Sequence, residues 1–211
     1  MSVTTQAAVT TQPGKQGDLH GSAPDNHHTA LLLIDVINDF EFPRGDELFN
    51  QALPLAPRIV ELKKRARAVG IPAVYVNDNF GRWQSNFEQL VKHCLHDGVR
   101  GRPFVDKLKP DAGSDYFVLK PKHSAFYQTP LDLLLKHFGA QRLILTGVST
   151  NSCVLFTAAD AYMRDLELIV PQDCVAACNV HEHEVAMEQI KCMLKADVSP
   201  SSEIDLSSLR C

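Results

Sequence analysis

Three residues suited to nucleophilic catalysis each follow a strongly apolar segment of the chain. Asp35 ends the run ALLLID, Lys120 ends DYFVLK, and Cys153 follows RLILTG after the turn VSTNS. A carboxylate can accept a proton, an ammonium can stabilise negative charge, and a thiolate can attack a carbonyl carbon. The three side chains together predict acyl-transfer chemistry, provided that the fold brings them to one place.

Cys153 stands where an expected helix begins, near Asn151, with residues 150–152 as candidate capping residues. The partial positive charge of a helix N-terminus favours a thiolate, and its free amides can hold an oxyanion. The alternative is a buried, inert cysteine. We adopt that inert interpretation for three other cysteines, Cys174, Cys178 and Cys192.

Asp35 follows five apolar residues, which predicts a partly buried carboxylate. Such a group needs partners or a raised pKa, and either condition suits a proton shuttle. The alternative is an acid that only organises the next loop, a role that would also suit Asp39. Lys120 could neutralise Asp35 or simply extend into solvent, and Lys122 has the same strand parity. The pattern alone does not choose between the two lysines.

Strand-like and helix-like segments alternate along the chain, which predicts a three-layer α-β-α fold with a doubly wound, mostly parallel sheet. Ligands of such folds bind outside the carboxyl ends of the strands, where the three candidate residues fall. Strands are expected at 30–35, 72–77, 115–120, 142–147 and 166–170. Helices are expected at 54–70, 85–98, 129–139, from about 151, and at 181–196.

The 211 residues suffice for one domain, expected at 29–198. Residues 1–28 are poor in large apolar side chains and are expected to form a poorly ordered arm, with a loosely attached tail at 199–211. A net charge of −4 gives no electrostatic footprint for nucleic acid or an anionic membrane, so the expected partner is a small-molecule substrate. The N-terminus lacks a secretory pattern and the cysteines are few, which indicates a cytoplasmic location.

Three blocks of sequence resemble the signature blocks of the isochorismatase-like cysteine hydrolases, which include nicotinamidases and N-carbamoylsarcosine amidohydrolase. They are LLLIDVINDF, VLKPKHSAFYQTPL and LILTGVSTNSCVLFTAADA, and the resemblance covers about residues 29–195. It implies an isochorismatase-like, Rossmann-like topology and an Asp35–Lys120–Cys153 triad, and so selects Lys120 over Lys122. It also implies a cis peptide at Val148–Ser149 and a homodimer or homotetramer.

The resemblance implies a mechanism of nucleophilic acyl transfer. Asp35 would take the thiol proton, Cys153 would attack the carbonyl carbon, and the amides of Ser149 and Cys153 would form the oxyanion hole. Asp35 would then protonate the leaving nitrogen and later activate water to cleave the thioester. Lys120 would stabilise the charges and hold the aspartate.

Two departures from the family patterns narrow the expected function. Isochorismatases cleave a vinyl ether without needing the thiol, and this chain retains Cys153, which favours C–N hydrolysis of an amide or carbamoyl compound. Nicotinamidases carry a metal-binding Asp-x-His motif and a further histidine, whereas VYVNDNFGRWQSNF contains Asp78 and no histidine. We therefore expect no metal and no cofactor, and nicotinamide is disfavoured as the substrate.

Two other functions remain open at this stage. One is vinyl ether hydrolysis with Cys153 as a bystander, and the other is a non-catalytic binding or redox-sensing relic of the fold. His181 and His183 stand among glutamates and are interpreted as part of a solvated helix face, not as metal ligands. Candidates for the substrate pocket are Phe40, Phe80, Trp83, His123 and Phe126.

Overall fold

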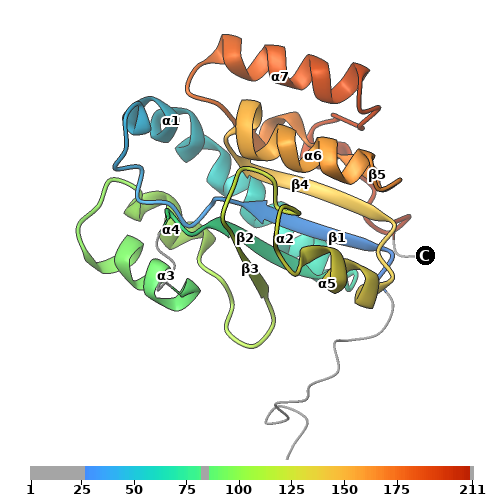
Figure 1. Ribbon diagram of the computed structural model, residues 1–211, viewed down its shortest axis with the longest axis horizontal. Helices are drawn as coiled ribbons and strands as arrows, with labels where there is room; N and C mark the ends of the chain where they lie inside the picture. Colours follow the sequence, from blue (N-terminus) through green and yellow to red (C-terminus); the bar gives the residue numbers. More distant parts are fainter. Residues whose placement is uncertain (1–26, 82–85, 210–211) are drawn as a thin grey trace, which may run out of the picture.

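A computed structural model describes residues 27–81 and 86–209, which form one parallel sheet between two layers of helices (Figure 1). The strand order is β3-β2-β1-β4-β5, with β6 paired to β4, and every pairing is parallel. The strands are β1 (Thr29–Ile34), β2 (Ala73–Asp78), β3 (Tyr116–Lys120), β4 (Arg142–Val148), β5 (Glu167–Ile169) and β6 (Val175–Ala176). The order reverses between β1 and β4, which is the ligand-binding position in doubly wound folds.

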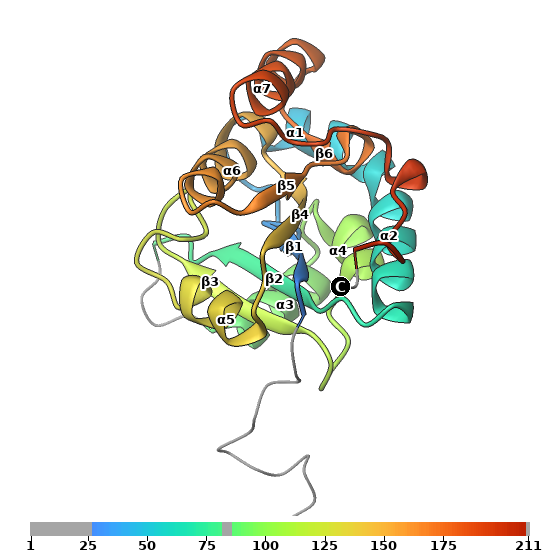
Figure 2. The same ribbon diagram turned by 90° about the vertical axis from the view of Figure 1, so that its right-hand side faces the viewer.

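Helices cover both faces of this sheet (Figure 2). One face carries α1 (Gly45–Ala52), α2 (Ala56–Ala68), α3 (Phe87–His96) and α4 (Arg102–Leu108). The other carries α5 (Leu131–Phe138), α6 (Leu155–Tyr162) and α7 (Val180–Cys192). The predicted three-layer α/β fold is confirmed. The short elements α1, α4 and β6 were not expected, because fewer than three helical turns, or a strand of two residues, leave little periodicity to recognise.

The central strand β1 explains why its sequence is apolar without alternation. Leu31 and Leu33 pack into the core beneath α2, whereas Leu32 and Ile34 pack into the core beneath α6. A strand buried on both faces needs apolar side chains at every position. The uninterrupted run therefore places β1 in the middle of the sheet, and the residue that follows it at the middle of the carboxyl edge.

Several helix ends coincide with the capping residues and glycines that the sequence indicates. The side chain of Asn86 caps α3 by accepting a hydrogen bond from the Gln89 amide at 2.8 Å. Gly139 ends α5 in the left-handed conformation, at φ 72°. Gly70 follows α2 with φ 84°. Each helix thus begins or ends close to the residue that its sequence suggests.

The C-terminal segment is more firmly attached than the loose tail expected from its composition. Ile204 and Leu206 are buried in the core beside α2. Arg65 donates hydrogen bonds to the carbonyl oxygens of Ser201 and Ile204, at 2.8 and 2.6 Å. Two apolar residues, Ile204 and Leu206, were enough to dock the segment, and a single apolar pair among polar residues is too short a pattern to predict it.

Only the last residues of the predicted N-terminal arm lie within the described part of the chain. There the His27 amide donates a hydrogen bond to the Phe138 carbonyl oxygen at 2.7 Å, which places the chain at the end of α5 before β1 begins. Within residues 27–81 and 86–209, no helix has both the length and the apolar character needed to cross a bilayer.

Gly147 allows β4 to lie against β1 at the switch point. Its φ is 107°, and a methyl group added there would lie 2.0 Å from the carbonyl oxygen of Ile34. Residues with a β-carbon rarely adopt this conformation, and no β-carbon fits so close to a backbone oxygen. A glycine is therefore required where β4 leads into the turn that carries Cys153.

We expect Gly147→Ala to lower the free energy of unfolding by more than about 3 kcal/mol, because it combines a backbone clash with an unfavourable φ. Gly70→Ala is the matched control, since Gly70 has φ 84° and open space around it. It should cost about 1 kcal/mol for the left-handed conformation alone. Denaturant titration of both variants measures the difference, and equal losses would contradict the steric explanation.

Candidate active site

Asp35, Lys120 and Cys153 meet at the carboxyl edge of the sheet. Asp35 follows β1, Lys120 ends β3, and Cys153 lies in a π-helical turn (Thr150–Val154) after β4. The Lys120 Nζ atom lies 2.9 Å from Asp35 Oδ2 and 3.3 Å from Cys153 Sγ. The structure thus brings together the three side chains that the sequence singled out.

The strand order explains why a lysine serves at this position. Strand β2 lies between β3 and β1, so the Lys120 backbone is two strands away from that of Asp35. Neighbouring strands are about 4.8 Å apart, which leaves roughly 10 Å to cross. The long lysine side chain covers most of that distance along the sheet edge, and the Asp35 side chain, reaching toward it, covers the rest. Lys122, the alternative by strand parity, is exposed.

The three groups are removed from solvent and together carry no net charge when the thiol is protonated. The exposed fractions are 0% for Lys120, 5% for Asp35 and 9% for Cys153. Burial raises the pKa of Asp35, against the opposing charge of Lys120. Burial alone would lower the pKa of Lys120, but the negative charges of Asp35 and Cys153 raise it overall. A paired ammonium and carboxylate is the arrangement that a buried site tolerates.

The resting state of Cys153 differs from the sequence-based expectation of a favoured thiolate. Burial, together with the negative charge of Asp35, raises the pKa of Cys153 to about 12, and the charge of Lys120 only partly opposes this. The start of the helix therefore does not dominate, because desolvation penalises the thiolate and the adjacent carboxylate repels it. The cysteine rests as a thiol beside a base.

Backbone geometry and hydrogen bonds hold Asp35 in position. The residue adopts φ 50°, a conformation in which aspartate and asparagine are over-represented among non-glycine residues. Its Oδ1 atom accepts a hydrogen bond from the Asp78 amide at 2.7 Å, and Oδ2 contacts Lys120. Asp78 also lies close to the ammonium, with Oδ2 3.6 Å from Lys120 Nζ. The carboxylate is fixed from two sides.

The turn that carries Cys153 has the expected backbone features. The Val148–Ser149 peptide is cis, which confirms the expectation from the family resemblance. The Ser149 carbonyl oxygen accepts hydrogen bonds from the amides of Ser152 and Val154, both at 3.1 Å. The predicted oxyanion-hole residues, Ser149 and Cys153, therefore belong to one compact turn beside Lys120 and Asp35.

Helix α7 supports this turn, a role that the sequence did not indicate. His183 Nδ1 lies 3.0 Å from the hydroxyl of buried Thr150, and Asn151 donates to Glu182 Oε2 at 3.2 Å. His183 is half-buried, and burial lowers its pKa. The interpretation of this histidine as part of a solvated face was wrong. The nearest sequence signal was the capping residue Asn179, which marks where α7 begins but not which of its residues face the turn.

Two of the predicted pocket residues belong to the hydrophobic core. Phe40 is fully buried, and its ring packs edge-on against Phe49 and Phe104. Phe126 is 5% exposed, with the Arg164 guanidinium 4.5 Å above its ring. Their proximity in sequence to Asp35 and Lys120 suggested a pocket, but both rings point into the fold.

Of the other three pocket candidates, two are exposed and one lies outside the described residues. Phe80 lies just after the carboxyl end of β2 and is 41% exposed. Its backbone amide donates a hydrogen bond to Asp78 Oδ1. His123 is exposed, with Nδ1 3.7 Å from Cys153 Sγ and 3.1 Å from Ser152 Oγ. Trp83 lies outside the described residues. His123 is therefore the pocket candidate in direct contact with the sulfur.

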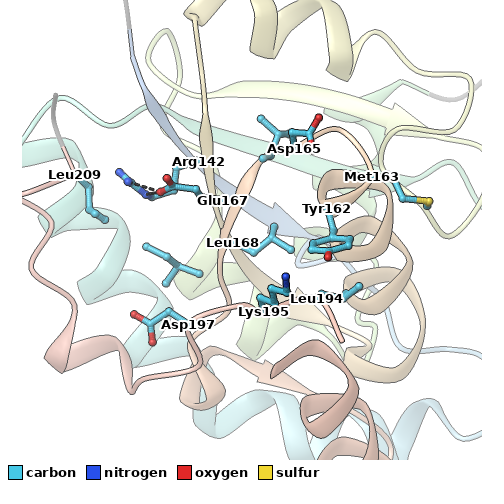
Figure 3. A pocket seen from close by; sticks show the side chains of 12 residues that line it. Arg142, Tyr162, Met163, Asp165, Glu167, Leu168, Leu194, Lys195, Asp197 and Leu209 are labelled. Carbon is cyan, nitrogen blue, oxygen red and sulfur yellow. Dashed lines mark hydrogen bonds and ion pairs between the residues drawn. The ribbon is translucent and has the colours of Figure 1, made fainter. Parts of the chain in front are cut away.

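An open hollow of about 750 Å³ lies at the opposite, amino-terminal end of β4 (Figure 3). Arg142 and Glu167 form an ion pair on its wall, and Leu168 and Tyr162 contribute apolar surface. Its lining contains no cysteine or histidine. Because ligands of doubly wound folds bind at the carboxyl ends of the strands, this hollow is distinct from the candidate active site.

No metal-ligand set is apparent within residues 27–81 and 86–209. No three side chains of the histidine, cysteine, aspartate and glutamate types converge there in a metal-binding arrangement. Asp78 is directed instead at the ammonium of Lys120. The absence of a bound metal stays a prediction.

Comparisons with known proteins agree with the fold and identify the family. The isochorismatase domain model matches residues 29–201. YaaI, an uncharacterized isochorismatase family protein of Bacillus subtilis, is 38% identical over 175 residues, covering 83% of this chain and 95% of that protein. The ureidoacrylate amidohydrolase RutB of Methylorubrum extorquens is 32% identical over 175 residues, covering 71% of this chain and 70% of that protein.

Among solved structures, N-carbamoylsarcosine amidase from Thermoplasma acidophilum superposes with a TM-score of 0.65 and 30% identity. The match covers 84% of this chain and 98% of that one. Domain model, sequence relatives and structure agree over most of the chain. The protein therefore belongs to the isochorismatase family of hydrolases.

Proposed function

We propose that this protein is a metal-independent cysteine hydrolase that cleaves the C–N bond of a small amide or carbamoyl compound through a thioester. The observation that carries the proposal is the position of the Lys120 ammonium, in contact with both the Asp35 carboxylate and the Cys153 sulfur. A base, a cation and a nucleophile within one buried contact network supply what acyl transfer requires.

The electrostatics of the site favour nucleophile activation during attack. Cys153 rests as a thiol, so the sulfur becomes nucleophilic only when its proton moves to Asp35. The raised pKa of Asp35 makes it a better proton acceptor than an exposed aspartate. The adjacent ammonium of Lys120 then stabilises the thiolate electrostatically. The negative charge moves from Asp35 to the sulfur while staying next to the same cation, so no isolated charge forms in the buried site. Attack on a carbonyl carbon gives an oxyanion, for which the amides of Ser149 and Cys153 are the proposed donors.

The names of the relatives support the class of bond. One relative is a ureidoacrylate amidohydrolase and one structural neighbour is an N-carbamoylsarcosine amidase. Both names denote cleavage at a carbonyl carbon bonded to nitrogen. A panel of primary amides, carbamoyl compounds and isochorismate, assayed for ammonia release and for isochorismate consumption, tests the proposed substrate class. Hydrolysis of isochorismate alone would contradict it.

We expect Cys153→Ala to abolish amide hydrolysis, because it removes the covalent route, and to cost roughly 1 kcal/mol of stability for the small void. Steady-state kinetics on the fastest amide of the panel, with a denaturant titration, measures both effects. Asp35→Asn should be comparably inactive, because the thiol then has no base. A vinyl ether hydrolase would show the opposite pattern, with Asp35→Asn inactive and Cys153→Ala nearly normal.

Asp35→Asn should also shift the ionisation of Cys153 to lower pH. The variant removes the carboxylate that raises the thiol pKa, and leaves the Lys120 ammonium 3.3 Å from the sulfur. The thiolate should then form well below the native pKa of about 12. Thiolate absorbance measured against pH, minus that of the matching Cys153→Ala protein, follows this titration.

Lys120→Met provides the comparison for that titration, because it removes the cation and leaves the carboxylate. Its Cys153 pKa should stay as high as in the native protein or rise further. If Asp35→Asn left the thiol titration unchanged, or moved it upward, the assigned balance of charges around the sulfur would be wrong.

A further inference from the structure

We propose that Asp78 is a positioning residue of the active site, the permanent counter-ion that holds the Lys120 ammonium in place while Asp35 carries the thiol proton. The proposal rests on the proposed cysteine hydrolase function and leaves every proton transfer with Asp35. It adds a fourth side chain to the site, one that acts on the reaction only through the lysine.

The register of the sheet directs Asp78 at the ammonium. Asp78 is the last residue of β2 and pairs with Lys120, the last residue of β3, so both side chains leave the same face of the sheet. The Asp78 Oδ2 atom lies 3.6 Å from Lys120 Nζ. Asp35 and Cys153 also contact this nitrogen, at 2.9 and 3.3 Å. Of these three partners, Asp78 is the one that exchanges no proton and forms no bond in the proposed reaction.

Two hydrogen bonds fix Asp78 in this position. Its Oδ1 atom accepts a hydrogen bond from the Phe80 amide at 2.6 Å, and its own amide donates to Asp35 Oδ1 at 2.7 Å. The side chain of Asp78 is 29% exposed, whereas that of Lys120 is fully buried. A carboxylate that keeps contact with water loses less solvation than a buried one, so Asp78 is suited to carry a permanent charge.

The proposed reaction removes both other negative charges from the vicinity of Lys120. Asp35 is neutral once it has taken the thiol proton, and the sulfur of Cys153 is neutral once the S–C bond has formed. The negative charge is then on the substrate oxygen, for which backbone amides are the proposed donors. A buried ammonium without an anionic partner is strongly disfavoured. Asp78 keeps Lys120 paired throughout this stage.

The electrostatics of Lys120 support this role. Burial would lower the pKa of Lys120, but three neighbouring negative groups raise it overall, namely Asp35, Cys153 and Asp78. His123, which also stands at this edge, lies 3.7 Å from the sulfur. The carboxylate of Asp78 is thus one of the charges that keep the lysine protonated.

A metal-binding role is the alternative for Asp78. Among residues 27–81 and 86–209, no three side chains of the metal-ligating types converge in a binding arrangement. The residue two positions after Asp78 is Phe80, where an Asp-x-His motif would place a histidine. The contact with Lys120 is therefore the interaction that accounts for this carboxylate.

The first experiment reproduces the stage at which Asp35 and the sulfur are both uncharged. The double variant Asp35→Asn/Cys153→Ala has this charge state and requires no substrate. The side-chain NMR signal of Lys120, assigned by its loss in Lys120→Met, reports protonation of the lysine against pH. Adding Asp78→Asn should lower the pKa of Lys120 by at least about 1 pH unit, because a nearby opposite charge typically shifts a pKa by about 1 to 3 units.

Asp39→Asn is the matched control in the same background. Asp39 has a similar side-chain exposure, 23% against 29% for Asp78. In both residues Oδ1 accepts a hydrogen bond from the backbone amide two positions later, which asparagine retains. The other oxygen of Asp39 contacts His93. The two substitutions thus differ in whether the lost charge faces Lys120, and Asp39→Asn should leave the lysine titration unchanged.

The second experiment measures turnover of the fastest amide of the panel. Asp78→Asn alone should lower kcat and kcat/KM alike by about 10-fold, the factor that corresponds to one pKa unit of lost charge interaction. Its activity should also decline at lower pH on the alkaline side of the rate profile, because an ammonium with one carboxylate fewer loses its proton earlier. Asp39→Asn should keep the native rate and profile, and a metal chelator should not affect the native enzyme.

Three results would overturn the proposal. They are an unchanged Lys120 titration on adding Asp78→Asn, a native alkaline limb in the single variant, and a loss of native activity on chelation that added zinc or manganese restores. Failure of the cysteine hydrolase function would appear separately, as an active Cys153→Ala enzyme or an inert amide panel. The lysine titration needs no substrate and decides the role of Asp78 in either case.

Discussion

The ammonium of Lys120 is the interaction on which the candidate site depends. It is fully buried, and a buried cation is tolerated only with anionic partners. Asp35 supplies that anionic partner at rest. Cys153 becomes a second anionic partner once it loses its proton, because its thiolate would be stabilised by the same nitrogen. At rest the ammonium of Lys120 is balanced by the carboxylate of Asp35. When the thiol proton moves to Asp35, the Cys153 thiolate takes over as the balancing anion, so the three groups together stay neutral. Charge is redistributed within the network without being created.

The sheet gives this network its geometry. Three strands on one side of the switch point and three on the other bring groups from β1, β3 and the turn after β4 to one edge. Gly147 permits the close approach of β4 to β1, and α7 supports the turn through His183 and Thr150. Positions on a rigid sheet and an anchored turn are suited to a site in which small displacements would be costly.

The sequence allowed the fold and the triad to be predicted because both depend on strong local signals. Uninterrupted apolar runs mark buried strands, and the polar residue after each run falls at the ligand-binding edge. Contacts between distant segments carry no such signal. The sequence therefore did not reveal that His183 packs on Thr150, that Phe40 turns into the core, or that Ile204 docks the C-terminal segment. The state of Cys153 was missed for the same reason, because its pKa depends on burial and on Asp35.

The pairing of β1 with β4 has a consequence for the order of events in folding. Thr29 pairs with Arg142, so the two central strands are joined across more than half of the chain. Contacts so distant in sequence carry a large loop-closure cost and form slowly. During synthesis on the ribosome, Asp35 emerges long before Cys153. The two can meet only after β4 has inserted beside β1. The β4-facing edge of β1 therefore lacks its partner strand until about two-thirds of the chain has been made, although β2 can already pair with the other edge.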